Sequence, residues 1–472
     1  MSPNTRLDEE PFDDDDAELD ESPESTAEAT RELTQEQRVL MHDAAYVWHP
    51  YTQHHAAPIP VPIARARGAW LYEPNGRPIL DAISSWWVTT HGHCQPEIVA
   101  AIAEQAGILD QVIFAGFTHE PAAMLAAALV SKLPQGPDHF LSRIFFSDNG
   151  STAVEVAIKL SLQSFANQGK PKRLIAALEH AYHGDTFGAM AAGARGVFTQ
   201  MYEPLLFEVA RLPDPSEGDT LRALDALIAS RGSELAAVIV EPLILGAGGM
   251  RVWDERVLQQ MRARTAAAGV HLIADEVMTG FGRTGPLFAC QRADVTPDLL
   301  CMSKGITGGA LPLGATAATE AIFDAFRDSD RTKTFFHGHS YTANPLACAA
   351  ALASLALFDD ESEDHRVRIE VAQARHLDSL RGTRGVRAVR QLGTVAAVEL
   401  ESAPGYLSEV GRELAAFAVR EGVLLRPLGT VAYCLPPYCT TDEELDRVYG
   451  VLQRFLDGER ADMPGSGGPV DD

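Results

Sequence analysis

The sequence predicts an α/β protein, with a large domain built on a mainly parallel sheet and a smaller α/β domain. Apolar runs typical of buried strands recur along the chain, among them Arg173–Ala177, Leu235–Val240 and His271–Ala274. Segments with helical periodicity, such as Glu120–Lys132 and Ala153–Gln168, lie before and between such runs. Strands that alternate with helices of this length form parallel sheets, because each helix returns the chain to the same edge.

The composition limits the classes of function. The chain has 472 residues, 46% of them hydrophobic, which is enough for more than one domain. A net charge of −26 argues against nucleic acid and against an anionic membrane surface. The longest apolar run, Ala347–Phe358, is too short to span a bilayer. Six cysteines without a C-x-x-C pair suit free thiols, and no signal-peptide pattern opens the chain, so we expect a cytoplasmic protein.

Five segments are expected along the chain. Residues 1–32 contain thirteen Asp or Glu and two Arg, so 1–33 is predicted to be a disordered acidic tail. Residues 34–85 form an N-terminal segment that joins the small domain, and Thr34 with Gln37 resembles a capping box at its start. The large domain follows at 86–358. The C-terminal small domain covers 359–457, and 458–472 is a flexible tail.

The elements before residue 170 are read from turns and periodicity. A hairpin from Trp70 to Asp81 turns at Asn75-Gly76, and an aromatic, loop-like stretch follows from Ser84 to His93. Two amphipathic helices come next, and then the strand Arg143–Phe146, a turn of small residues and a long helix. The helices are expected at Glu97–Gln111, Glu120–Lys132 and Ala153–Gln168.

The elements after residue 170 follow the same logic. Apolar runs predict strands at Arg173–Ala177, Leu235–Val240, His271–Ala274, Leu299–Met302 and Gly314–Ala318, before an Ala-rich helix at Pro345–Leu357. The pattern then changes to helix, strand, helix, strand, with strands at Thr394–Leu400 and Gly422–Pro427 and a last helix at Glu443–Leu456.

Two strand ends carry the residues on which the functional hypothesis depends. Asp275 closes one apolar run, and Lys304 follows the next, 304 − 275 = 29 residues later. Residues just past the carboxyl ends of parallel strands line the ligand crevice of such a sheet. Lysine forms a Schiff base with pyridoxal phosphate, and an acid pairs with the pyridine nitrogen of that cofactor. On spacing alone, a surface lysine and a capping aspartate explain these residues equally well.

Two further motifs have competing interpretations. Gly280–Gly285 fits the dinucleotide fingerprint G-x-G-x-x-G, but Pro286 and the residues after it do not open a helix, which disfavours nicotinamide binding. The turn at Gly150-Ser151 before a long helix suits a phosphate group, because helix N-termini offer free N–H groups. Ordinary helix capping explains the same residues. Tyr182, at a strand end, can stack on a planar cofactor.

A resemblance resolves these alternatives. Ile273–Val277, Thr279–Gly285 and Ser303–Gly305 resemble the signature of class III, fold-type I pyridoxal phosphate aminotransferases. The resemblance runs from about Trp48 to about residue 455. Within this family, the sequence most resembles the enzymes of biotin synthesis that convert 8-amino-7-oxononanoate to 7,8-diaminononanoate. The blocks that carry this finer similarity are Trp48–Thr52, Ser84–Trp87, Tyr182–Met190, Gly246–Met250 and Asn344–Cys348.

The resemblance implies a role for each matching residue. Lys304 would form the Schiff base and then move the proton as general acid and base, and Asp275 would hold the ring nitrogen. Tyr182 would stack on the ring, and Tyr51 would help to choose the amino donor. Gly150 and Ser151 would bind the phosphate. Gly338, His339 and Ser340 would belong to a loop that comes from the second subunit of a homodimer, with Ser340 on the phosphate. Trp86 would line the substrate pocket, and Arg426 would bind the substrate carboxylate.

The amino donor stays open at this point. His337-Gly-His-Ser340 differs from the His-Gly-Pro-Thr of much of the biotin group and resembles enzymes of this step that use lysine. We favour S-adenosylmethionine because Trp86 and Tyr51 lie in blocks similar to those of its users. The alternatives are the lysine-dependent version, a broad ω-amino acid:pyruvate aminotransferase, and a non-catalytic protein of the same fold. We expect no metal, since the pairs His91/His93 and His337/His339 lack further ligands.

Overall fold

A computed structural model describes residues 33–55, 57–403 and 405–459 of the chain. Apart from Leu33, Gly458 and Glu459, the predicted acidic tail at 1–33 and the flexible tail at 458–472 lie outside the described residues. The chain divides into two compact units. One comprises the described residues up to Ala64 with Glu73–Gly76, and the other comprises Arg65–Tyr72 and the described residues from Arg77 onward. The expected domain boundary near residue 358 falls within the second unit and stays a prediction.

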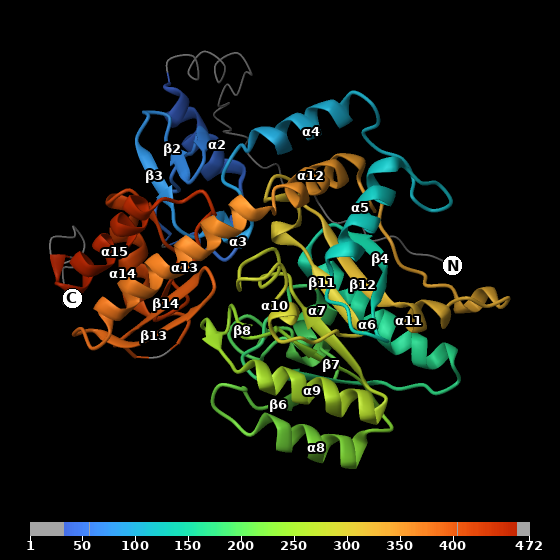
Figure 1. Ribbon diagram of the computed structural model, residues 1–472. Helices are drawn as coiled ribbons and strands as arrows, with labels where there is room; N and C mark the ends of the chain where they lie inside the picture. Colours follow the sequence, from blue (N-terminus) through green and yellow to red (C-terminus); the bar gives the residue numbers. More distant parts are fainter. Residues whose placement is uncertain (1–32, 56, 404, 460–472) are drawn as a thin grey trace, which may run out of the picture. The chain divides into compact units, whose positions relative to one another are not determined.

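A seven-stranded mixed sheet organises the larger unit (Figure 1). Its spatial order is β4-β12-β11-β10-β7-β5-β6. The neighbours from β11 to β6 pair in parallel, whereas β12 runs antiparallel to both β11 and β4. The mainly parallel α/β sheet predicted from the sequence is therefore confirmed, with one reversed strand. The strands are β4 (Leu141–Ser147), β5 (Leu174–Leu178), β6 (Val209–Leu212), β7 (Leu235–Val240), β10 (His271–Asp275), β11 (Leu299–Met302) and β12 (Gly314–Thr319).

The sheet is buried on both faces, which explains its continuous apolar strands. Successive residues of β10 belong to different core clusters: Leu272 and Ala274 lie in the larger, and Ile273 lies in the smaller with the inner face of α6. This alternation follows from the two-residue period of a strand. Helix α6 (Gly150–Asn167) packs across the middle of the sheet (Figure 1). Its N-terminus is therefore fixed relative to the strand ends.

The remaining helices belong to the larger unit, apart from α2, which belongs to the other unit. Among the described residues, those outside the C-terminal part are α2 (Gln35–Tyr46), α3 (Ser84–Trp87), α4 (Pro96–Ala106), α5 (Glu120–Lys132), α7 (Phe187–Ala192), α8 (Thr220–Arg231), α9 (Glu255–Ala268), α10 (Ala289–Arg292), α11 (Glu320–Asp324) and α12 (Pro345–Ala356). Short 3-10 turns occur at Glu203–Leu205, Lys304–Thr307 and Arg331–Lys333. No helix of the described residues is long and apolar enough to cross a membrane.

The C-terminal part has its own antiparallel sheet, in the order β13-β14-β16. Its elements are α13 (Asp360–Leu380), β13 (Val386–Leu392), β14 (Val395–Leu400), α14 (Glu409–Arg420), β16 (Val431–Cys434) and α15 (Asp442–Leu456). Between α14 and β16, β15 (Val423–Leu424) joins a separate four-stranded sheet beside β3. The other strands of that sheet are β1 (Arg65–Arg67), β2 (Trp70–Tyr72) and β3 (Pro78–Asp81), and a two-stranded ribbon pairs β8 (Ile244–Leu245) with β9 (Arg251–Val252).

Several local expectations are confirmed and one is refined. Thr34 and Gln37 form the expected capping box of α2, and β2 pairs antiparallel with β3 as the predicted hairpin requires. The aromatic stretch after Ser84 begins with the short helix α3. Its backbone is irregular, because Ser85 and Trp87 have φ values of +60° and +68°. Non-glycine residues whose backbone has a positive φ commonly mark a functional or strained site.

Candidate functional site

Four neighbouring strands of the large sheet bring their carboxyl ends to one cavity. In the spatial order β5, β7, β10, β11 they carry Tyr182, Glu241, Asp275 and Lys304 at or just beyond these ends. All four residues line a cavity of about 610 Å³. This is a normal volume for a small-molecule site, which typically holds about 300–1,000 Å³. The expectation that Asp275 and Lys304 face one ligand site is consistent with this geometry.

Lys304 occupies a backbone position that lysine rarely adopts. It opens a 3-10 turn after β11 with φ of +45°, and its Nζ lies 4.5 Å from the ring centroid of Trp87. Burial lowers the pKa of Lys304 to about 8, and Arg283 adds to this decrease, while Asp275 and Glu241 oppose it through their negative charge. A lysine with this pKa supplies a neutral, nucleophilic amine near physiological pH.

Asp275 is held by a histidine that the sequence analysis did not single out. The Nδ1 of His183 donates to Oδ2 of Asp275 at 2.6 Å, and the backbone N–H of Val277 donates to Oδ1 at 3.1 Å. Both side chains are nearly completely buried. The carboxylate therefore has a fixed orientation in the cavity wall. The Nε2 of His183 is buried and has no hydrogen-bond partner among the described residues.

Glu241 is a second buried carboxyl of the same wall. It is 5% exposed and accepts hydrogen bonds from the backbone N–H groups of Tyr182 and Gly246, both at 2.9 Å. Burial raises the pKa of Glu241 to about 7, and the charge of Asp275 adds to the increase, whereas His183 and the two hydrogen bonds oppose it. The site therefore contains a carboxyl group that titrates near neutral pH.

The start of α6 forms the third part of the cavity. Asn149 caps the helix by accepting a hydrogen bond from the Thr152 N–H, and Asn149, Gly150 and Ser151 line the cavity. The Ser151 hydroxyl accepts from the Thr186 N–H at 3.0 Å. A Cβ on Gly150 would lie 2.6 Å from a methyl carbon of Val277, so any larger residue there would have to displace Val277. Free N–H groups and the helix dipole suit this end to a phosphate.

These features together fit pyridoxal phosphate. A lysine amine, a buried carboxylate and a helix N-terminus surround one cavity, and Tyr182 adds an aromatic side chain to its lining. A pyridine aldehyde with a phosphate needs this set of groups: an amine for the aldehyde, an acid for the ring nitrogen and N–H donors for the phosphate.

Two predicted substrate residues lie together elsewhere. Trp86 and Arg426 are not among the described residues that line this cavity, and the Arg426 guanidinium carbon lies 4.8 Å from the Trp86 ring centroid. The neighbouring Trp87 lines the cavity instead. Which member of the Trp pair faces the ligand depends on the irregular backbone of α3, which the sequence pattern does not reveal. The substrate roles of Trp86 and Arg426 stay predictions.

The loop expected to reach a second subunit does not line the cavity of its own chain, as far as the described residues show. Gly338 and Ser340 are exposed, and His339 is partly buried. The Ser340 carbonyl accepts from the Gln111 side chain at 2.6 Å. Tyr51 belongs to the other compact unit of the chain, so its predicted role also remains a prediction.

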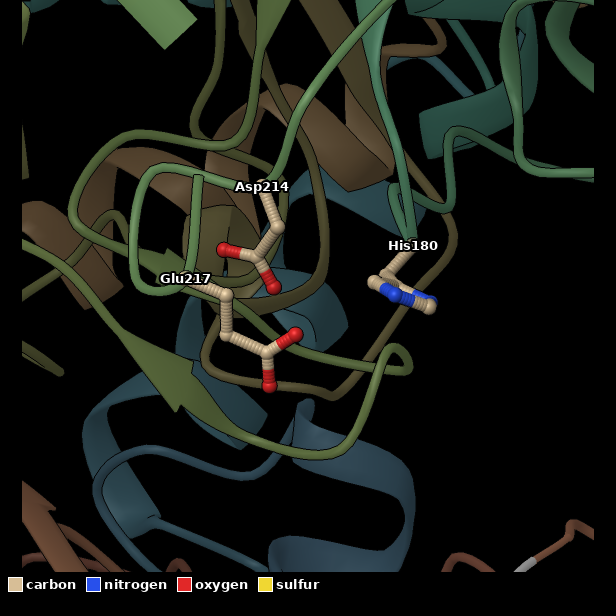
Figure 2. Close-up of side chains that lie close together, drawn as sticks. All are labelled: His180, Asp214 and Glu217. Carbon is tan, nitrogen blue, oxygen red and sulfur yellow. The ribbon is translucent and has the colours of Figure 1, made fainter. Parts of the chain in front are cut away.

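Three side chains, His180, Asp214 and Glu217, have the chemistry of metal ligands. Their ligand atoms all lie within 4.8 Å of one another, and Figure 2 shows the three side chains close together. However, Nη1 of Arg251 lies 3.2 Å from an Asp214 oxygen and also pairs with Glu217. A metal ion would have to displace a guanidinium that both carboxylates already share. We therefore assign this group to an ion-pair network.

The histidine pairs considered as metal ligands have other partners. His91 lies 3.1 Å from the Ser354 hydroxyl, and His93 pairs with Asp81 at 2.8 Å. His337 lies 3.2 Å from the Lys159 amine.

Comparisons with known proteins agree with this site. The chain matches the family model of class-III aminotransferases over residues 51–456. A Synechococcus elongatus protein named adenosylmethionine-8-amino-7-oxononanoate aminotransferase is 50% identical over 422 residues, covering 87% of this chain and 98% of that protein. The crystal structure of a protein of the same name from Methanocaldococcus jannaschii is 32% identical with a TM-score of 0.84, covering 89% of this chain and 99% of that one.

A third similarity concerns the cofactor. An amine transaminase from an uncultivated Pseudomonas species, solved in its PLP-bound form, is 30% identical with a TM-score of 0.80. It covers 87% of this chain and 98% of its own. Because the family match spans most of the sequence, the chain belongs to the class-III aminotransferases.

Proposed function

We propose that this protein transfers an amino group to 8-amino-7-oxononanoate, giving 7,8-diaminononanoate, with pyridoxal phosphate as cofactor and S-adenosylmethionine as amino donor. The observation that carries the proposal is the single cavity lined by Lys304, Asp275 and the N-terminus of α6. The reaction named for the relatives from Synechococcus elongatus and Methanocaldococcus jannaschii supports the choice of acceptor and donor.

The residues of this chain divide the chemical work. Bound pyridoxal phosphate acts as the electron sink that stabilises a carbanion on the substrate carbon. Lys304 Nζ, whose pKa of about 8 keeps part of it neutral, takes the proton from that carbon and later returns a proton. The Asp275 carboxylate, oriented by His183, keeps a proton on the pyridine nitrogen. The Trp87 ring packs against the Lys304 amine.

Arg426 and Trp86 provide the contacts proposed for the substrate. Arg426 is exposed and lies against the face of Trp86, so its guanidinium can bind a carboxylate while the indole offers an apolar surface. This pair suits a substrate with a carboxylate and an apolar carbon chain.

A second copy of the chain completes the proposed enzyme. Large apolar side chains are exposed in two segments of the chain, namely Ile113 at 62% in the first and Phe336 at 79% and Tyr341 at 64% in the second. The Gln111 side chain bonds to the Ser340 carbonyl, which brings the segment before Ile113 beside the loop of Phe336 and Tyr341. Exposed apolar surface of this kind marks an interaction site. We infer a homodimer in which Gly338, His339 and Ser340 serve the partner's cavity. We also retain the expectation that the enzyme works in the cytoplasm.

The amino donor is tested by a half-reaction on purified holoenzyme. The visible absorbance of the lysine-bound cofactor should disappear on addition of S-adenosylmethionine and return on addition of 8-amino-7-oxononanoate, with 7,8-diaminononanoate as product. Loss of the band with lysine alone would assign the lysine-dependent version. Turnover with ω-amino acids and pyruvate but not with 8-amino-7-oxononanoate would overturn the proposal. Lys304→Ala should lose both the band and turnover.

A further inference from the structure

Glu241 is the one buried carboxyl among the described cavity-lining residues that the transamination scheme above does not use. It follows β7, the strand between β5 and β10, and so occupies the middle of the row of strand ends. Its two oxygens accept hydrogen bonds from two different backbone segments. Oε1 accepts from the Tyr182 N–H and Oε2 from the Gly246 N–H.

Each segment controls one part of the cavity wall. The first carries Tyr182 itself, which lines the cavity. The second places Gly246 against two other lining residues, because a Cβ at this position would lie 2.8 Å from the Met278 methyl and 3.5 Å from the Trp87 ring. Trp87 in turn lies beneath the Lys304 amine. Contacts therefore run from Glu241 to Tyr182 in one direction and to Lys304 in the other.

We propose that Glu241 is a positioning residue of this site, whose carboxylate holds the Tyr182 segment and the Gly246–Trp87 wall at the separation that the cofactor ring requires. The inference rests on the proposed cofactor chemistry and goes beyond it by assigning a role to a residue that need not touch the reacting atoms. Only an ionised carboxylate offers two equivalent acceptors to two N–H donors.

The same geometry gives the wall a dependence on pH. The titratable groups that face Glu241 are His183 and Asp275 on the strand-end side and Lys304 beyond Trp87, whereas Met278 and Trp87 on the Gly246 side do not titrate. A carboxyl whose pKa is raised to about 7 is ionised above that pH and protonated below it. Protonation turns one of the two acceptor oxygens into a donor, so one N–H loses its partner as the pH falls.

The test uses Glu241→Gln, which keeps the shape of the side chain and one acceptor oxygen but replaces the other by an N–H donor. The probe is pyridoxine 5′-phosphate, which lacks the aldehyde and therefore reports the shape of the cavity without attachment to Lys304. We expect the variant to bind the probe about tenfold more weakly at about pH 8, the effect of one buried N–H left without an acceptor. Wild-type affinity should change between about pH 8 and about pH 6 with a contribution from Glu241, and the variant should lose this contribution and keep only that of Lys304, so the two pH profiles should differ.

Glu276→Gln is the matched control. Glu276 is also a buried carboxyl with a pKa raised by burial, but it accepts from Thr279, Ala289 and Cys290 and is not among the described residues that line the cavity. This variant should lower the melting temperature and keep the pH dependence of probe binding. Equal affinity and equal pH dependence in wild type and Glu241→Gln would overturn the proposal, as would the same loss in both variants.

The experiment separates this inference from the proposed function. The probe titration contains no amino donor or acceptor, so a wrong substrate leaves its outcome unchanged. Failure of the wild-type protein to bind the probe at any pH would instead overturn the cofactor assignment. With a working donor, Glu241→Gln should reduce kcat more than it raises KM, because it displaces the groups around the reacting carbon and leaves Arg426 in place.

Discussion

At the scale of single residues, the environment of Lys304 sets the pH at which its free amine becomes neutral. Burial beside Trp87 lowers the pKa of its amine to about 8, and Asp275 and Glu241 keep it from falling further. The protonated amine cannot attack an aldehyde, so the neutral fraction limits covalent loading of pyridoxal phosphate.

We therefore expect the rate of covalent loading to rise with pH and to level off above about pH 8, more than two units below the usual pKa of lysine. Stopped-flow absorbance of apoprotein mixed with pyridoxal phosphate measures this rate. A rate that continues to rise through about pH 10 would show an ordinary, solvated lysine. Arg283→Met is the informative companion variant, because removal of this buried charge should move the inflection to higher pH.

A residue of this site could be recognised in the sequence when its position depended on the end of a single strand. Asp275 and Lys304 follow apolar runs and therefore face the crevice whichever strands are neighbours. His183 and Glu241 were visible as polar residues after strands, but their contacts depend on β7 lying between β5 and β10. The place of Trp87 in the cavity wall depends on its positive φ, which two adjacent tryptophans in the sequence do not predict.

At the scale of elements, α15 shows how a local motif stabilises the C-terminal part. Its N-cap Thr441 accepts from the Glu444 N–H at 3.2 Å, and the Glu444 carboxylate accepts from the Thr441 N–H at 2.8 Å. The same carboxylate accepts from Trp70 Nε1. One capping box thus connects the helix to strand β2.

Thr441→Ala should lower the free energy of unfolding by about 1 kcal/mol, the usual cost of losing an N-cap side chain. Thermal denaturation of the holoenzyme measures the change, and Thr441→Ser is the control because its hydroxyl can still accept. Equal stability of Ala and Ser variants would contradict the assignment of this cap.

Element positions followed from the sequence more closely than element ends. Glu120–Lys132 and Leu235–Val240 have the expected bounds. The helix begins after its cap His119, with Pro121 in the first turn, and a glutamate lies at each end of the strand. The helix predicted to reach Gln111 ends at Ala106, because Gly107 closes it. Helix ends depend on capping contacts that periodicity alone does not contain.

At the scale of the whole molecule, the exposed apolar surface around Phe336 predicts the assembly state. Phe336→Asp should dissociate the proposed dimer, because the charge would be buried without a partner at the interface. Sedimentation velocity measures the mass, and cofactor retention on dilution reports whether the sites are shared. Val371→Asp, an equally drastic change at a 65% exposed position of α13, should remain dimeric. A dimeric Phe336→Asp protein would place the interface elsewhere.

The division of the chain into units depends on contacts between distant segments. The sequence suggested a boundary near residue 358 from a change in the pattern of elements, and this boundary stays a prediction. The compact units divide near Ala64, with Glu73–Gly76 joining the first of them. A change in the pattern of elements marks where element types change. It does not reveal which elements share one core, since that depends on contacts between distant segments.

The reversed strand β12 has a consequence for biosynthesis. In the described part of the chain, strand β4 joins the large sheet only through β12, and Gly314 at the start of β12 packs against the Asn149 carbonyl at the cap of α6. A nascent chain that has not yet reached residue 314 therefore leaves β4 as an unpaired edge while it is translated, and such edges recruit other chains. The contact between Gly314 and the cap of α6 forms only after residue 314 has been translated, so pyridoxal phosphate can stabilise this end of the site only from that point on.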